Sequence, residues 1–174
     1  MTKNAFLAVG LLFLGAALVA SAVHATEPGE ALWFDMENCA FCKNLSKDPQ
    51  LLKNMSWEHH DISNGVATIT VVKPEFKKSY LEAQAAMMDV GKKMQSGELK
   101  MADVKMCGHC QTYGKLMMMG AKMEHVQGTF ADVTLMTSDN PEMAKEIKAF
   151  AQRNRDEMAK MEQAEKAEKP AKTK

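Results

Sequence analysis

The alternation of hydrophobic and polar residues predicts two β-hairpins, one in each half of the chain. Residues 56–62 and 66–72 are rich in β-branched side chains and flank Asn64-Gly65, a dipeptide typical of tight hairpin turns. Residues 123–136 have a similar pattern and predict the second hairpin. Both segments therefore favour antiparallel strands.

Each predicted hairpin is followed by a sequence that predicts a helix. Pro74-Glu75 and Pro141-Glu142 are suited to the first turn of a helix. The apolar positions that follow are mostly three and four apart, which predicts one buried face. They are Phe76, Tyr80, Ala83, Met87, Val90 and Met94 in the first helix, and Met143, Ile147, Phe150 and Ala151 in the second. Charged residues dominate from Arg153 onward, so we expect the second helix to fray and residues 156–174 to form a solvated tail.

Both hairpins are preceded by a C-x-x-C motif. Residues 31–34 predict a strand before Cys39-Ala40-Phe41-Cys42, which begins a helix-like stretch that ends near Leu52. Residues 101–106 predict a weak strand before Cys107-Gly108-His109-Cys110, which begins a helix directed towards Gly120. Each half of the chain thus has the order β-α-β-β-α.

Specific residues recur between the two halves, 64 to 68 positions apart. The pairs are Cys39 with Cys107, Cys42 with Cys110, Glu58 with Glu124, His59 with His125, Ala67 with Ala131, Thr70 with Thr134, Pro74 with Pro141, and Glu75 with Glu142. This recurrence indicates an internal duplication, against the alternative of chance similarity. We predict an α+β fold in which two tandem ferredoxin-like repeats, residues 26–97 and 98–155, pack about a pseudo-two-fold axis.

Residues 1–25 have the pattern of a secretory signal peptide. Lys3 precedes an apolar run over residues 5–20, and Val23-His24-Ala25 provides the small residues of a cleavage site. This run is shorter than the roughly 20 residues that span a bilayer, and no later stretch is long and apolar enough to do so. We therefore expect a periplasmic or secreted protein, in a compartment where cysteines tend to be oxidised.

Composition narrows the class of function. The chain has 174 residues with 22 basic and 22 acidic side chains, so it has no net charge that would favour binding to nucleic acid. It contains no Gly-rich phosphate loop, no G-x-S-x-G motif and no H-E-x-x-H motif. These features favour a protein that binds without catalysing a reaction.

The four cysteines give the main functional signal, because all of them lie in the two C-x-x-C motifs. Two intervening residues let both sulfurs face one point, and the start of a helix stabilises a thiolate. We favour soft-metal binding, either Cu(I) on each pair or Zn(II) on one site that joins Cys39, Cys42, Cys107 and Cys110. Structural disulfides within each motif are an alternative in an exported protein.

Histidines and methionines could supply further ligands. His59 and His125 lie on the strand that follows each C-x-x-C segment, and His109 lies inside the second motif. The alternative for each is an ordinary surface histidine. Thioether sulfur also binds Cu(I), but most of the 16 methionines are expected to fill the core. Met36 and Met106, which lie close to cysteines in the sequence, are the best candidates for ligands.

Both motif regions resemble a known family. The segments Met36-Glu37-Asn38-Cys39-Ala40-Phe41-Cys42 and Met106-Cys107-Gly108-His109-Cys110 resemble the heavy-metal-associated domains of copper chaperones and copper pumps. In that family a Met-x-Cys-x-x-Cys loop precedes the first helix of a β-α-β-β-α order. The resemblance covers most of residues 31–155 and implies Cu(I) or a similar ion on each cysteine pair.

The second motif also resembles another class of protein. Cys107-Gly108-His109-Cys110 has the same four residues as the active site of protein disulfide isomerases. That resemblance implies thiol–disulfide exchange, in which Cys107 attacks and Cys110 resolves the mixed disulfide. The surrounding sequence does not favour a thioredoxin fold, because no Trp precedes Cys107. We therefore expect a metal ion as the partner, together with another exported protein in some contexts, and keep redox exchange as the alternative.

Overall fold

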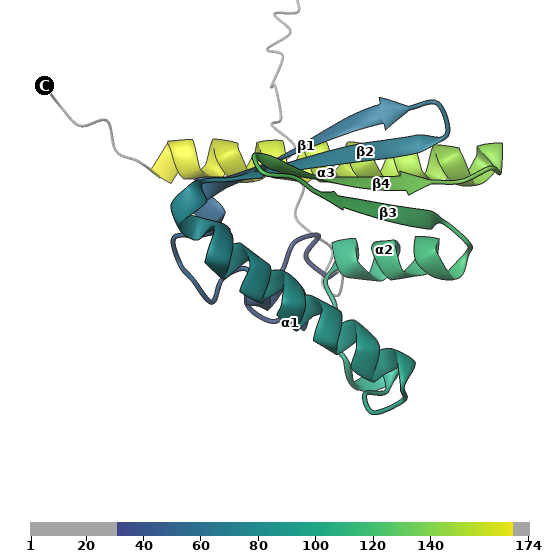
Figure 1. Cartoon of the computed structure of the whole chain (residues 1–174), viewed down its shortest axis with the longest axis horizontal. Helices are drawn as coiled ribbons and strands as arrows, with labels where there is room; N and C mark the ends of the chain where they lie inside the picture. The colour runs from purple at the N-terminus through teal and green to yellow at the C-terminus, as the bar shows by residue number, and fades with distance from the viewer. Residues whose placement is uncertain (1–30, 169–174) are drawn as a thin grey trace, which may run out of the picture. The chain divides into compact units, whose positions relative to one another are not determined.

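The computed structural model describes residues 31–168, so the predicted signal peptide lies outside the described residues. These residues form an α+β fold with one antiparallel sheet and three α-helices (Figure 1). The strands are β1 Met55–Ile62, β2 Gly65–Val72, β3 Lys122–Gln127 and β4 Ala131–Thr137. The helices are α1 Lys77–Gln95, α2 Gly108–Met118 and α3 Pro141–Glu168. Both predicted hairpins and the predicted helices after them are confirmed.

The sheet joins the two hairpins in the order β1-β2-β4-β3, with β2 paired to β4 in the middle. The turn of the first hairpin is Ser63-Asn64, and Gly65 is the first residue of β2. A Cβ at Gly65 would collide with the carbonyl oxygen of Met136 on β4. The glycine of the Asn-Gly signal is therefore needed for the close approach of the two central strands.

A symmetric row of side chains crosses all four strands. His59 on β1 lies opposite Thr68 on β2, Thr68 lies opposite Thr134 on β4, and Thr134 lies opposite His125 on β3. Each histidine shares a hydrogen bond with its threonine, at 2.9 Å for His59 and 3.1 Å for His125. In this row Thr68, and not the expected Thr70, corresponds to Thr134. Thr68 and Thr134 are 66 positions apart, as are His59 and His125.

The order of elements within each half differs from the predicted β-α-β-β-α. Residues 31–34 and 101–106 form no strand, and residues 101–103 form a 3₁₀ turn instead. The stretch after Cys39 contains only the short 3₁₀ turns Cys42–Asn44 and Leu52–Asn54. Each half therefore contributes one hairpin to a shared sheet and has a helix after that hairpin. The division into two ferredoxin-like repeats stays a prediction.

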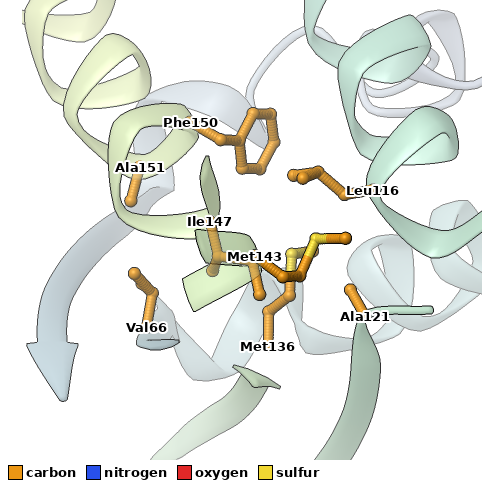
Figure 2. Close-up of a cluster of buried hydrophobic side chains, with 8 residues drawn as sticks. All are labelled: Val66, Leu116, Ala121, Met136, Met143, Ile147, Phe150 and Ala151. Atoms are coloured by element: carbon orange, nitrogen blue, oxygen red, sulfur yellow. The ribbon is translucent and has the colours of Figure 1, made fainter. Parts of the chain in front are cut away.

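The helices gather on one face of the sheet, where the apolar side chains of alternate strand positions are buried. One cluster joins α2 and α3 to the central strands (Figure 2). Its members are Val66, Leu116, Ala121, Met136, Met143, Ile147, Phe150 and Ala151. A second cluster packs Tyr80 and Ala83 of α1 against Val72 and the segment around Leu51. Both clusters lie on the same side of the sheet, and the buried cysteines form a third cluster among residues 31–168.

A buried ion pair attaches α1 to the second hairpin. The Lys77 ammonium lies 2.9 Å from Oδ1 of Asp132, a β4 residue whose side chain is 1% exposed. The other oxygen, Oδ2, has no hydrogen-bond partner among the described residues. Removal of Lys77 would leave a buried charge without its counterion, so this contact fixes the position of α1.

The C-terminal helix is longer than the sequence led us to expect. α3 does not fray at Arg153 but continues as an α-helix to Glu168. Asn154 and Met158 extend its buried face beyond Ala151, since Asn154 is 1% exposed and Met158 is half-buried. Among residues 31–168, none of the helices combines the length and the apolarity that a membrane crossing requires.

Candidate metal centre

The fold brings the four cysteines into one cluster. Their sulfur atoms all lie within 4.8 Å of one another, although the two motifs are far apart in the sequence. The Sγ atom of Cys42 lies 3.6 Å from that of Cys107 and 3.4 Å from that of Cys110. All four cysteines are free thiols in the structure. The arrangement is one that a soft metal ion could occupy, and the short contacts run between the motifs rather than only within them.

The first motif lies in an irregular segment that side chains hold in place. The carboxylate of Asp35 accepts hydrogen bonds from the backbone N–H groups of Glu37 and Asn38, at 3.2 and 2.8 Å, and these donors keep its pKa below its usual value. The amide of the buried Asn44 donates to the carbonyl groups of Ala40 and Phe41. These bonds replace the regular helix that we expected after Cys39.

The second motif lies at the start of a regular helix. Cys107 precedes α2, and the backbone N–H of Gln111 donates to its carbonyl oxygen at 3.0 Å. The N–H groups of Gly108 and His109 donate to the carbonyl oxygens of Leu32 and Trp33, each at 2.9 Å. These two N–H groups at the start of the helix were expected to stabilise a thiolate, but they already donate to backbone carbonyl groups. The same bonds explain why residues 31–34 are not a strand.

The two motif segments are joined directly by backbone contacts. The N–H of Ala40 donates to the carbonyl oxygen of Lys105 at 2.9 Å. Gly108 lies so close to Trp33 that a Cβ at this position would be 3.0 Å from the indole ring. The close packing against Trp33 favours a glycine at this position of Cys-Gly-His-Cys, and a redox role is not needed to explain it.

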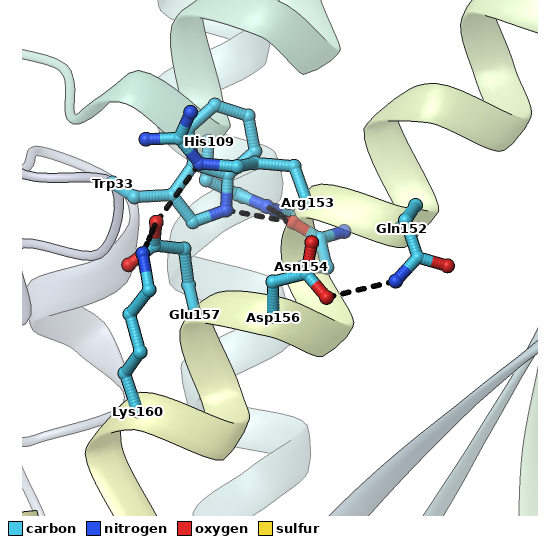
Figure 3. Close-up of polar contacts among 8 residues, drawn as sticks. All are labelled: Trp33, His109, Gln152, Arg153, Asn154, Asp156, Glu157 and Lys160. Carbon is cyan, nitrogen blue, oxygen red and sulfur yellow. Dashed lines mark hydrogen bonds and ion pairs between the residues drawn. The ribbon is translucent and has the colours of Figure 1, made fainter.

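His109 is anchored to α3 and does not lie among the sulfur atoms. Oδ1 of Asn154 accepts a hydrogen bond from Nε1 of Trp33 at 2.9 Å, and Nδ1 of His109 also lies 2.9 Å from it (Figure 3). Because an indole N–H can only donate, this oxygen is an acceptor, and Nδ1 of His109 carries the proton. The ring packs against Phe34 and Phe150, and this burial lowers the pKa of His109. The imidazole is thus neutral, with the lone pair on Nε2.

The thiols change the acidity of one another. Hydrogen bonding with Cys107 is the largest of the contacts that lower the pKa of Cys39, and hydrogen bonding with Cys110 leads in lowering the pKa of Cys107 to about 6. Contact with Cys107 is also the main reason why the pKa values of Cys42 and Cys110 are raised. The four thiols therefore titrate as one interacting group, in which a thiolate is stabilised by the protonated thiols beside it.

The other predicted ligands lie outside the four-sulfur group. His59 bonds to Thr68 and faces a cavity that Cys42 and Cys110 also line, whereas His125 is exposed on the edge strand β3. Met36 packs against the cysteine cluster, but Met106 contributes a carbonyl oxygen that accepts a hydrogen bond from Gln111. Of these four residues, Met36 packs against the cysteines and His59 lines the cavity beside them.

Asn154 and Trp33 are structural parts of this site that the sequence analysis missed. Asn154 was placed near the beginning of a solvated tail because its neighbours are charged. The helical spacing does contain a signal for it, since positions 147, 150, 154, 158 and 161 continue one face at intervals of three and four. The pattern was not recognised because Asn154, at the centre of that face, is polar.

Comparisons with known proteins gave no match. No protein-family model, no curated protein sequence and no solved structure matches the chain.

Proposed function

We propose that this is an exported soft-metal-binding protein in which Cys39, Cys42, Cys107 and Cys110 together hold one ion, with Zn(II) the best fit. The observation that carries the proposal is the convergence of all four sulfur atoms within 4.8 Å. In a tetrahedral site with zinc–sulfur bonds of about 2.3 Å, neighbouring sulfurs are about 3.8 Å apart. The separations of 3.4 and 3.6 Å from Cys42 need only small adjustments to reach that value.

The surroundings of the cluster favour a closed site. Cys39, Cys42 and Cys107 are 0%, 6% and 2% exposed. Four thiolates fill the coordination of a tetrahedral ion, so no position is left for a substrate. This supports binding without catalysis, as the absence of other catalytic motifs in the sequence also suggested. A Cu(I) ion, which soft thiolates also select, is the competing occupant.

Proton release is part of the proposed binding step. A metal ion binds thiolates, and the raised pKa values of Cys42 and Cys110 mean that these two sulfurs keep their protons in the free protein. Binding of the ion therefore displaces protons from the cluster. Affinity must weaken as the pH falls, because protons compete for the same sulfur atoms.

Export is the part of the proposal that rests on sequence alone. Lys3, the apolar run of residues 5–20 and Val23-His24-Ala25 support a signal peptide that directs the chain to the periplasm or outside the cell. In that compartment a bound ion would protect four neighbouring thiols from oxidation. The resemblance to heavy-metal-associated domains remains a prediction and supplies no further support.

The test is elemental analysis of the protein purified without chelators or oxidants. We expect one soft-metal ion per chain, and we expect each single Cys→Ser substitution in the cluster to reduce this content similarly. Thr129→Ser, at an exposed position of the loop between β3 and β4, is the control and should keep the ion. Metal-free wild-type protein, or two ions lost independently with the two motifs, would contradict a single shared site.

Redox exchange makes a different prediction that the same variants can examine. If Cys107 attacks and Cys110 resolves, Cys110→Ser should trap mixed disulfides that Cys107→Ser cannot form. We expect equal behaviour of the two variants in a trapping assay, because both only remove a ligand. Accumulation of a mixed disulfide in Cys110→Ser alone would favour the exchange reaction.

A further inference from the structure

A cavity beside the cysteine cluster has an unusual set of side chains. It has a volume of about 300 Å³ and lies between the helix-covered face of the sheet and α3. Thr68 and Thr134, at the centre of the symmetric row, face it from the sheet, and Cys42 and Cys110 line it from the metal centre. Its wall therefore connects the cysteine cluster with the hairpins.

Soft donor groups are concentrated in this wall. Besides two cysteines, the lining includes four methionines and two histidines: Met87, Met136, Met158, Met161, His59 and His109. None of the described residues that line the cavity carries a carboxylate. Divalent ions that prefer oxygen ligands would find no negative charge here, whereas thioether and imidazole groups suit a soft ion of single charge.

Two of these methionines are not explained by core packing. Met136 belongs to the buried cluster of Figure 2, and Met87 packs against the second cluster. Met158 and Met161 belong to none of the buried clusters of residues 31–168, and Met161 is 49% exposed. They nevertheless line the cavity from one face of α3, since they are three residues apart on a helix.

His59 lines the cavity together with these methionines. His59 and Met158 line both the cavity and a second, more open hollow that includes Arg155 and Glu162. Burial, followed by the charges of His109, Arg155 and His60, lowers the pKa of His59 to about 4. The ring is therefore neutral at neutral pH. Its Nδ1 is engaged with Thr68, and no residue in the described range forms a hydrogen bond with Nε2.

We propose that the cavity is a second metal site, which takes one Cu(I) ion on the imidazole of His59 and the thioethers of Met158 and Met161. The site is distinct from the four-cysteine centre, because these three residues come from β1 and α3 and none belongs to the four-sulfur group. The same cavity is lined by Cys110, the cysteine that is only partly buried. It therefore offers a path by which a soft ion reaches the thiols.

The first experiment is an anaerobic titration of zinc-loaded protein with Cu(I) delivered as its complex with a colorimetric chelator. We expect the protein to take one equivalent of Cu(I) while its zinc is retained. Met158→Leu, Met161→Leu and His59→Gln should each lower the Cu(I) affinity by about tenfold or more. Met118→Leu and Met119→Leu, which change exposed thioethers at the end of α2, are the matched controls and should leave it unchanged.

The second experiment observes the proposed methionine ligands directly and so does not depend on metal binding by the cysteines. Ag(I), a diamagnetic substitute for Cu(I), should shift the methyl resonances of Met158 and Met161 in the NMR spectrum at the first equivalent. Unshifted methyl groups, or release of one zinc for each Cu(I) bound, would overturn the second site. If a variant also loses its zinc, its Cu(I) affinity is not compared, and the NMR measurement on wild-type protein decides. Absence of zinc with shifted methyl groups would contradict the four-cysteine centre and leave the cavity site standing.

Discussion

The two C-x-x-C motifs have the same chemistry but differ in what holds them. The second motif begins α2, where regular backbone hydrogen bonds fix its geometry. The first lies in residues 35–45, where the Asp35 carboxylate and the Asn44 amide do most of the positioning. A helix start retains its shape without a ligand, whereas a loop held by a few side chains is more easily opened. The comparison indicates that the ion matters more for the local order of the first motif.

Removal of the ion should have the largest effect on stability and should distinguish the two motifs most clearly. We expect a strong chelator to lower the free energy of unfolding by several kcal/mol, because metal binding is coupled to folding. Hydrogen–deuterium exchange should then rise more in residues 35–45 than in α2. Equal loss of protection in both segments would show that the two motifs depend on the ion to the same degree. Chelation of Cys39→Ser protein is the control and should change little.

Asn154 connects α3 to Trp33 and to His109 of the second motif. Asn154→Ala would leave the buried donors of Trp33 and His109 without an acceptor, so we expect a loss of about 2–4 kcal/mol in chemical denaturation. Gln152→Ala, two residues earlier, removes only exposed hydrogen bonds, one donated to Asp156 and two accepted from Arg155, and should cost less than about 0.5 kcal/mol. A similar cost for both variants would mean that the buried amide is not needed.

The packing of the two motif segments against each other can be tested with two glycines of α2. Gly108→Ala would place a methyl group 3.0 Å from the Trp33 indole, and we expect a loss of about 1–2 kcal/mol. Gly114→Ala has open space around it and should stabilise the helix by up to about 1 kcal/mol. Thermal unfolding measures both changes. Stabilisation by Gly108→Ala would show that Trp33 moves away at little cost.

The smallest expected effect concerns pH and the edge of the first hairpin. The pKa of His59 is about 4 in the folded protein and near 6.5 in the unfolded chain, so the unfolded state binds the proton more readily. Stability that is present above pH 6.5 should fall as the pH is lowered through this range. We expect His59→Gln to flatten the decline, and His125→Gln, on the exposed edge strand, to leave it unchanged. Denaturation midpoints at several pH values provide the measurement.

Short sequence motifs were sufficient to predict the hairpins and helices whose ends are determined by neighbouring residues. Asn64-Gly65, Pro74 and Pro141 mark turns and helix starts through short-range chemistry, and the structure confirms the hairpins and helices that they predict. Residues 31–34 fail as a strand because their carbonyl groups bond to the start of α2, which lies far away in the sequence. A contact of this kind produces no periodic pattern of hydrophobic residues in the sequence, so it could not be predicted.

The sequence identified the cysteines of the candidate site but left open whether the two pairs form one site or two. The spacing of the cysteines identified all four members of the cluster. Their convergence depends on the pairing of β2 with β4 and on the bond from Ala40 to Lys105, which sequence patterns do not specify. The cavity and its methionines were missed for the same reason, because each methionine alone is indistinguishable from a core residue.

The pairing of β2 with β4 also has a consequence for the order of folding. Each hairpin joins residues that are near in the sequence, whereas β2 and β4 lie at opposite ends of a long connecting loop that contains α1 and α2. Closing a long loop costs conformational entropy before its contacts can form, and non-local pairing slows folding. The hairpins should therefore form early and meet late. An ion bound by both motifs would tie the chain at a second distant point and oppose the separation of the two hairpins.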